Sequence, residues 1–183
     1  MTAAADRSAA ALDLVTLVRH MEWADARLWE AVLALPAERA APAMLEKLHH
    51  VHYVQAVFFA RAHGEKGTPP KLESFDGLAP LAAWAREQYP AMHATVAALD
   101  EPSRGRPVPA PEQLRAMVAD ATPADATAAD AILQVVTHTI HHRGQLNLVV
   151  RELGGEPPRL DLILWAWNGK PEARWPDAAA TGA

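Results

Sequence analysis

Hydrophobic residues recur at intervals of three or four along four long stretches of the chain, which is the spacing of a helix with one buried face. The first stretch runs from Leu12 to Leu35 and ends at Pro36. Residues 44–62 form the second stretch, which is apolar around most of its circumference and is followed by the breaker sequence "HGEKGTPPK". That pattern predicts a helix at the centre of the fold.

The second half of the chain adds two more predicted helices. Residues 78–99 form the third, followed by the proline-rich loop "DEPSRGRPVPAP", and residues 111–119 are expected to form a short extra turn. Thr122-Pro123 and Thr127-x-x-Asp130 both resemble N-terminal caps of the fourth helix. This helix continues to Leu153, where two glycines end it, and "EPPRLDLILWAWNG" forms a last short segment.

Four long helices with longer middle connections predict an all-α fold, a four-helix bundle of the up-down type with longer crossover connections. A chain of 183 residues suits one domain, so we expect residues 10–168 to form the bundle and residues 169–183 to form a polar C-terminal tail. Half of the residues are hydrophobic and 21% are charged, which indicates a globular protein. Aromatic residues make up only 6%, which favours helices over a β-sandwich.

Charge and composition exclude several classes of function. The net charge of −5 argues against a nucleic-acid-binding surface, which needs clustered basic residues. No cysteine is present, so disulfides and thiolate metal ligands are excluded. The longest apolar run, "LILWAW", is too short to cross a bilayer, and the first residues do not resemble a secretory leader. We therefore expect a cytoplasmic protein with no nucleic-acid or membrane partner.

The sequence "HTIHHRGQ" at residues 138–145 places histidines inside the fourth helix. His138 and His142 stand one turn apart, so their rings stack on one face, while His141 leans toward its flank. The face they share is otherwise apolar and comprises Ala131, Val135, Leu146, Val149 and Leu153.

The second helix carries its own cluster, His49, His50 and His52, and position 50 lies one turn before Val54, so it can also face inward. One interpretation is that these are core histidines. Buried histidines would then need hydrogen-bond partners, because an unsatisfied buried polar group costs about 1–3 kcal/mol. Two inward histidines that face a second cluster favour a metal site instead, since one ion satisfies several imidazoles at once. Imidazole ligands suit zinc, nickel, copper and ferrous iron.

Several segments resemble the DinB-like (YfiT-like) superfamily. "HTIHHRGQL" is similar to the H-x-x-x-H-R-G-Q run on the last long helix of that family, and "KLHHVHYVQAVFFARAHGE" resembles its second helix. "HMEWADARLWEAVLALP" is similar to the first helix and "LDLILW" to the closing segment, so the resemblance spans residues 12–168.

This resemblance implies a four-helix bundle, commonly dimeric, in which three histidines bind a divalent metal. Carried over by position, the implied ligands are His50, His138 and His142, with His49 and His52 as alternatives by spacing alone. Gln55 stands where many relatives carry an acidic residue, so no acid–base role is assigned there, and no catalytic residue is named. We expect zinc or nickel first and iron or manganese second, and a homodimer.

The sequence also predicts roles for residues near the "HTIHHRGQ" motif and on the first helix. We expect Arg143 to form a buried or interfacial ion pair, and Gly144 to mark the close approach of another helix. Gln145 is expected to hold a ligand imidazole. On the first helix, His20, Glu22 and Asp25 could approach the metal, but we expect them on a solvated face. Trp23 and Trp29 are expected in the core or at an interface. Three further tryptophans are expected to cover an end of the bundle or to be buried at a dimer contact: Trp165, Trp167 and Trp175.

Three neutral histidines leave an open coordination position, which is typical of catalytic sites. The superfamily includes transferases and isomerases that use low-molecular-weight thiols, so the resemblance implies a metal-dependent enzyme that acts on small molecules, such as a thiol S-transferase. The alternatives are a metal-dependent hydrolase of small molecules and a non-catalytic, metal-stabilised stress or interaction protein.

Overall fold

The computed structural model describes residues 13–110 and 126–177 and is mostly helical, which confirms the all-α class. The long helices are α1 (Leu14–Leu33), α2 (Ala37–His63), α3 (Leu78–Glu87), α4 (Tyr89–Ala98) and α7 (Ala128–Glu152). The shorter elements are η1 (Leu72–Ser74), α5 (Glu101–Arg104), α8 (Leu162–Trp167) and two strands that pair in antiparallel fashion, β1 (Pro107–Val108) and β2 (Ala126–Thr127).

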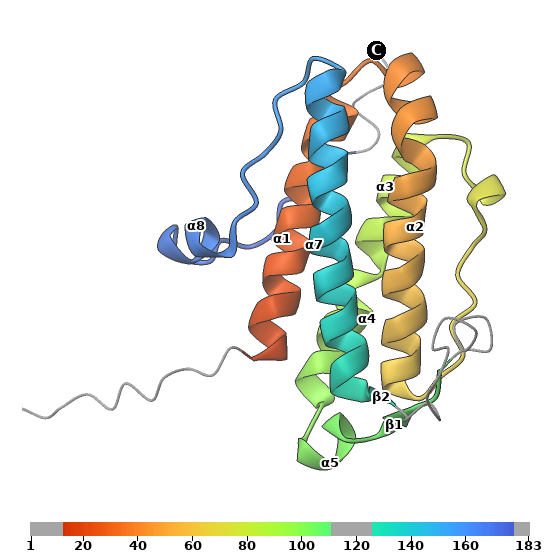
Figure 1. The fold of residues 1–183 in the computed structure, drawn as a ribbon, viewed down its shortest axis with the longest axis vertical. Coiled ribbons are helices and arrows are strands. Elements are labelled where there is room, and N and C mark those ends of the chain that lie inside the picture. The colour runs from red at the N-terminus through yellow and green to blue at the C-terminus, as the bar shows by residue number, and fades with distance from the viewer. Residues whose placement is uncertain (1–12, 111–125, 178–183) are drawn as a thin grey trace, which may run out of the picture.

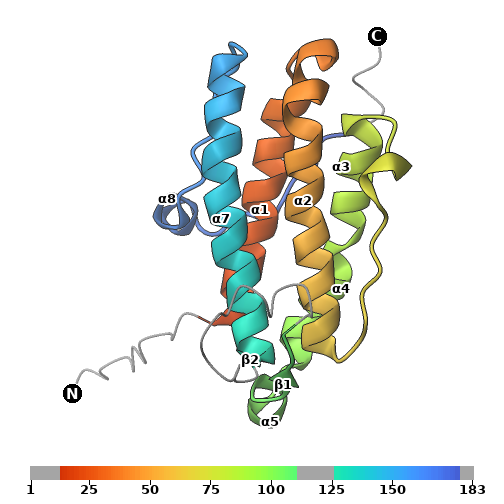
Figure 2. The ribbon, with the colours of Figure 1, turned by 45° about the vertical axis from the view of Figure 1, so that its right-hand side comes forward.

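The long helices run side by side, and one long connection sets their directions (Figure 1, Figure 2). α2 returns antiparallel to α1, and residues 64–77 then travel back along the outside of α2, so that α3 and α4 run in the same direction as α2 (Figure 1). α7 runs antiparallel to α2 and packs against both α2 and α1. This topology places the middle of α2 beside the middle of α7.

The first two helices differ slightly from the predicted ranges. α1 begins after Asp13, whose carboxylate accepts a hydrogen bond from the backbone N–H of Thr16 at 2.6 Å as an N-terminal cap. α2 begins at Ala37, earlier than residue 44, and includes Pro42. Pro42 is exposed, so water can satisfy the carbonyl group that the proline leaves without a donor.

The third predicted helix is two helices, α3 and α4, separated at Gln88. Pro90 explains the break, because its ring lacks an N–H and clashes with the preceding turn. The capping box of Thr127 and Asp130 is confirmed: each residue bonds the backbone N–H of the other, at 3.1 and 2.9 Å. The extra turn predicted at residues 111–119 and the cap predicted at Thr122 lie outside the described residues.

The core is formed by the inward faces of α1, α2, α3, α4 and α7. Trp29 and Tyr89 are fully buried there. Gly67 allows the long connection to pack closely against α2, since a Cβ at this position would lie only 2.8 Å from the Cβ of Ala60. The packing of α2 against α7 positions the site described next. Within the described residues, no helix has the length and apolarity needed to cross a membrane.

Candidate metal centre

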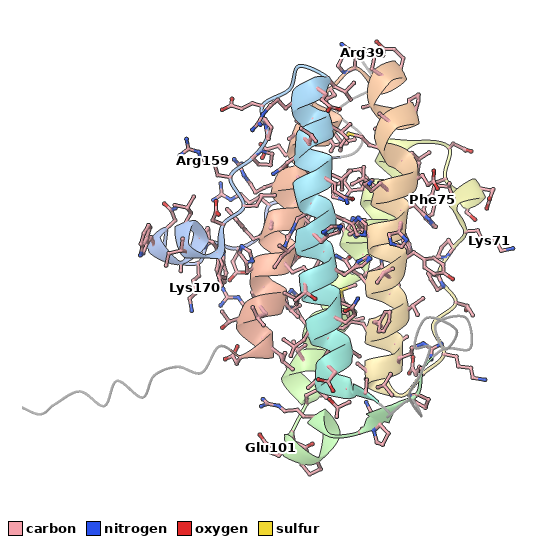
Figure 3. The ribbon with its side chains drawn as sticks, viewed as in Figure 1. Arg39, Lys71, Phe75, Glu101, Arg159 and Lys170 are labelled. Carbon is pink, nitrogen blue, oxygen red and sulfur yellow. The ribbon has the colours of Figure 1, made fainter. Side chains whose placement is uncertain are left out.

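The structure brings His50, His138 and His142 together between the middle of α2 and the middle of α7. The Nε2 atom of His138 lies 3.1 Å from Nε2 of His50 and 3.1 Å from Nε2 of His142. One ring nitrogen from each histidine lies within 4.8 Å of the other two. Figure 3 shows side-chain nitrogen atoms gathered between α7 and α2 at this level. The three histidines therefore form a group that could hold a divalent metal ion.

Gln145 fixes the tautomer of His142. Lys47 has only donors, and its Nζ lies 2.7 Å from Gln145 Oε1, so this atom of the amide acts as an acceptor. His142 Nδ1 lies 2.9 Å from the same oxygen and must therefore carry a proton and donate it. When the ring carries this one proton, Nε2 of His142 has a lone pair, and this atom lies 3.1 Å from His138 Nε2. The contact expected between Gln145 and this imidazole is confirmed.

The arrangement of these nitrogen atoms fits a metal ion. For ligands about 2.0–2.1 Å from a tetrahedral zinc ion, the separation between nitrogen atoms is about 3.3 Å, close to the two observed distances of 3.1 Å. His138 Nδ1 is buried and has no hydrogen-bond partner among the described residues, so only its Nε2 can be satisfied. A metal cation can coordinate the lone pairs of all three nitrogen atoms at once. Hydrogen bonds among the three rings cannot use all of these lone pairs, because the rings carry too few protons.

Burial and the neighbouring imidazoles lower the pKa of two of the ligand candidates, His50 and His138. Burial first, and then the neighbouring imidazoles of His142 and His50, lower the pKa of His138 to about 4. Partial burial of its ring also lowers the pKa of His50, followed by electrostatic repulsion from the neighbouring His142, His49 and Lys47 side chains. Neutral imidazole is the form that binds metals, so His50 and His138 are in the ligand form at neutral pH.

The cluster is open to solvent on one side. His50 is exposed, while His138 and His142 are half-buried. Among the residues that the structure describes, no fourth histidine, aspartate or glutamate joins the group. An ion held by three protein ligands has a position left for a small molecule, which is the arrangement of catalytic rather than closed structural sites.

Comparison with protein families gives one assignment. The sequence matches the DinB family over residues 7–173. The chain belongs to the DinB family. A search of curated proteins gives no match.

The other histidines of this DinB-family protein lie outside the cluster. His49 points to the opposite side of α2, where its Nε2 lies 2.9 Å from the carbonyl oxygen of Pro70 and its ring packs on Trp84. His141 is exposed, and its Nε2 accepts from Gln145 Nε2 at 2.9 Å. His52 is buried in the core beside Trp29. None of the three contributes to the group of three converging nitrogen atoms.

His52 belongs to a buried chain of hydrogen bonds. Its Nε2 accepts from Trp29 Nε1 at 2.9 Å, so its Nδ1 carries the proton and donates to Gln55 Oε1 at 2.7 Å. Gln55 Nε2 donates to Asp25 Oδ2 at 2.8 Å and to Thr139 Oγ1 at 3.2 Å. Tyr89 also donates to Asp25 Oδ2, at 2.5 Å. This network joins α1, α2, α4 and α7 next to the candidate metal centre.

Sequence reasoning missed this network because it treated the polar residues of α1 as a solvated face. That expectation is wrong: His20 and Asp25 are 3% and 2% exposed, and Glu22 is half-buried, where it accepts from Trp175 Nε1 at 3.1 Å. The helical spacing does indicate that Asp25 is buried, since Asp25 lies one turn after Met21 on the same face of α1 and Met21 is buried.

The structure confirms the expectation for Arg143 and contradicts the one for Gly144. The buried ion pair is confirmed, because Arg143 Nη1 lies 3.3 Å from Asp25 Oδ1 and 3.1 Å from the carbonyl oxygen of Met21. The close helix approach expected at Gly144 is wrong for the described chain, where a Cβ at this position would have no neighbour within 4 Å. Gly144 instead lies on an exposed face of α7 between Ile140 and Leu148.

The tryptophans divide between the core and the surface. Trp29 and Trp165 are buried, and Trp23 is half-buried. Trp175 packs on Tyr89 with ring centroids 5.6 Å apart, while Trp167 is 76% exposed. The exposed indole is therefore available for contact with another molecule.

Proposed function

We propose that this DinB-family protein is a metal-dependent enzyme that acts on small molecules, with His50, His138 and His142 as the ligands of a divalent ion. Zinc and nickel suit a set of three imidazoles best, and iron or manganese come second. The observation that carries the proposal is the convergence of three histidines in a cluster that is open to solvent: His138 Nε2 lies 3.1 Å from Nε2 of His50 and 3.1 Å from Nε2 of His142, and one ring nitrogen of each residue lies within 4.8 Å of the other two.

A bound divalent ion would supply Lewis acidity, which lowers the pKa of a thiol or a water molecule that coordinates it. Residues of the chain favour the metal-binding form of the three histidines. Gln145 accepts the proton that His142 carries on Nδ1, and partial burial lowers the pKa of His50 and His138. We propose a low-molecular-weight thiol as one substrate and S-transfer as the reaction.

The exposure of His50 supports an enzyme over a non-catalytic, metal-stabilised protein, because a purely structural site is usually closed by a fourth protein ligand. The same open position serves a metal-dependent hydrolase, which is the second candidate. The arrangement of α1, α2, α7 and the α3–α4 pair supports the four-helix bundle that the sequence predicts, with residues 64–77 as its long crossover.

Metal analysis of the purified protein tests the ligands. We expect close to one divalent ion per chain, sharply lower occupancy in His50→Ala, His138→Ala and His142→Ala, and full occupancy in the exposed control His141→Ala. Full occupancy in the His138→Ala, His142→Ala double variant would contradict the site.

Cobalt substitution tests the reaction class. Addition of a small thiol should produce a sulfur-to-cobalt charge-transfer band. If cobalt fills the site and no thiol changes its spectrum, the hydrolase or the non-catalytic function replaces the transferase.

A further inference from the structure

Lys47 places a positive charge at the rim of the candidate metal centre without a carboxylate to pair with it. It precedes His50 by one turn on α2, is half-buried, and donates from Nζ to Gln145 Oε1 at 2.7 Å. Within the described part of the chain, no aspartate or glutamate forms an ion pair with Lys47. A partly buried ammonium group whose partner is a neutral amide oxygen retains most of its attraction for an anion.

His141 supplies a second donor at the same rim. Its Nε2 accepts from Gln145 Nε2 at 2.9 Å, so the proton of neutral His141 resides on Nδ1. The His141 ring is exposed and lies 5.1 Å from the ring of His142, measured between centroids. Lys47 and His141 therefore contact the two polar atoms of the Gln145 amide, Oε1 and Nε2, and the same Oε1 accepts from His142.

The charge of the metal centre also favours binding of an anion beside it. Three neutral imidazoles leave the charge of a divalent ion uncompensated, and Lys47 adds to it. Glu46 is the opposing charge: it precedes His50 by one turn on α2 and is exposed. Its carboxylate repels an anion from the His50 flank, so an anionic group is directed to the flank where Lys47 and His141 lie.

Resting on the metal-dependent function proposed above, we propose that Lys47 and His141 form an anion subsite that selects substrates carrying a carboxylate a few bonds from the atom that coordinates the metal. Two separate N–H donors match the two oxygens of a carboxylate. In this arrangement Lys47 is the specificity-determining residue, because its ammonium group is the cationic donor of the pair. Nothing in the subsite has to ionise for the selection to operate.

Paired ligands of equal length test this subsite in the cobalt-substituted protein. One pair is 3-mercaptopropionate and its neutral analogue 3-mercapto-1-propanol. The other pair lacks a thiol and consists of the monohydroxamate of succinate and neutral butyrohydroxamate, which has the same number of carbon atoms. Affinities are read from the visible spectrum of cobalt, so no turnover is needed, and the cobalt content of each variant is measured in parallel.

We expect the wild-type protein to bind the anionic member of each pair about tenfold more tightly, as one charge-assisted hydrogen bond in a half-buried setting provides. Lys47→Met should abolish this preference, leave the neutral ligands within twofold, and retain cobalt. Lys47→Arg should restore most of the preference. The matched control Lys71→Met, at the outer edge of the long connection (Figure 3), should behave as wild type.

An equal preference for anionic ligands in wild type and Lys47→Met, or no preference in wild type, would overturn the subsite. If only the hydroxamate pair perturbs cobalt and shows the dependence on Lys47, the subsite stands and the thiol function falls. If thiols bind cobalt without regard to their charge, the thiol function stands and the subsite falls. Failure of cobalt to bind would overturn both.

Discussion

Gln55 Nε2 donates a hydrogen bond to Asp25 Oδ2 at 2.8 Å, inside the core and away from water. The same amide accepts from His52 Nδ1 through Oε1 at 2.7 Å. Only a side chain with both an acceptor and a donor can make these two contacts at once. The amide at position 55, where many relatives are expected to carry an acid, is therefore required by Asp25 in this chain.

Gln55→Glu should destabilise the protein by about 3 kcal/mol or more at pH 8, because it places a second carboxylate against Asp25 in the core. Repulsion and burial raise the folded-state pKa of the new carboxyl above its unfolded value. The folded state therefore binds a proton more readily, and the loss of stability relative to wild type should shrink as the pH falls to 5.5. Urea unfolding at both pH values measures this, with exposed Gln134→Glu as the control. Equal stability of Gln55→Glu and wild type at pH 8 would contradict the network.

Gln145→Ala should weaken metal binding about 10- to 100-fold, since His142 Nδ1 loses the acceptor that orients the ring. Gln145→Glu keeps an oxygen for His142 and Lys47 and should bind metal at least as tightly as wild type. Competition with a chromophoric chelator measures both affinities. Asn147→Ala, another amide removed from the same helix, is the control. Unchanged affinity in Gln145→Ala would show that the tautomer of His142 does not depend on this contact.

The metal-free protein should lose stability as the pH falls below about 6.5, and His20 accounts for part of the loss. Burial, followed by the charge of Arg143, lowers the pKa of His20, whose Nε2 donates to the carbonyl oxygen of Leu160 at 3.0 Å. The unfolded chain then takes up a proton at a pH where the folded chain does not, which favours unfolding. His20→Gln retains an N–H donor and cannot titrate. Its stability, measured by chemical denaturation at pH 7.5, 6.5 and 5.5, should fall less steeply than that of wild type, and equal slopes would exclude His20.

A homodimer should form through the exposed face of α7. Ile140 and Leu148 are 52% and 53% exposed on one face of α7, on either side of Gly144, so two large apolar side chains of this face are uncovered. Light scattering at tens of micromolar should give a dimer for wild type and a monomer for the Ile140→Glu, Leu148→Glu double variant. The double variant should keep its metal, and Val15→Glu on α1 should stay dimeric. A monomeric wild-type protein would contradict this interface.

The sequence alone determined the helical class and most helix positions. Apolar residues at intervals of three or four specify a helix with a buried face, and the Thr127–Asp130 capping box fixes the start of α7, because these signals depend only on neighbours along the chain. The histidine spacing on α7 likewise placed His138 and His142 on one face. The pairing with His50 came from resemblance to a family, since no local pattern specifies which helices become neighbours.

Tertiary structure decided which polar residues are buried and which histidines meet. His50 and His52 are two residues apart, yet the rotation of α2 directs His50 to the open cluster and His52 to Trp29 in the core. Asp25 is buried because Gln55, Tyr89 and Arg143, from three other helices, satisfy its oxygens. A charge can leave water only where such partners converge, and their convergence depends on how the helices pack. Helix packing is set by the whole core, so residues 88 positions apart, such as His50 and His138, become neighbours only in the folded chain.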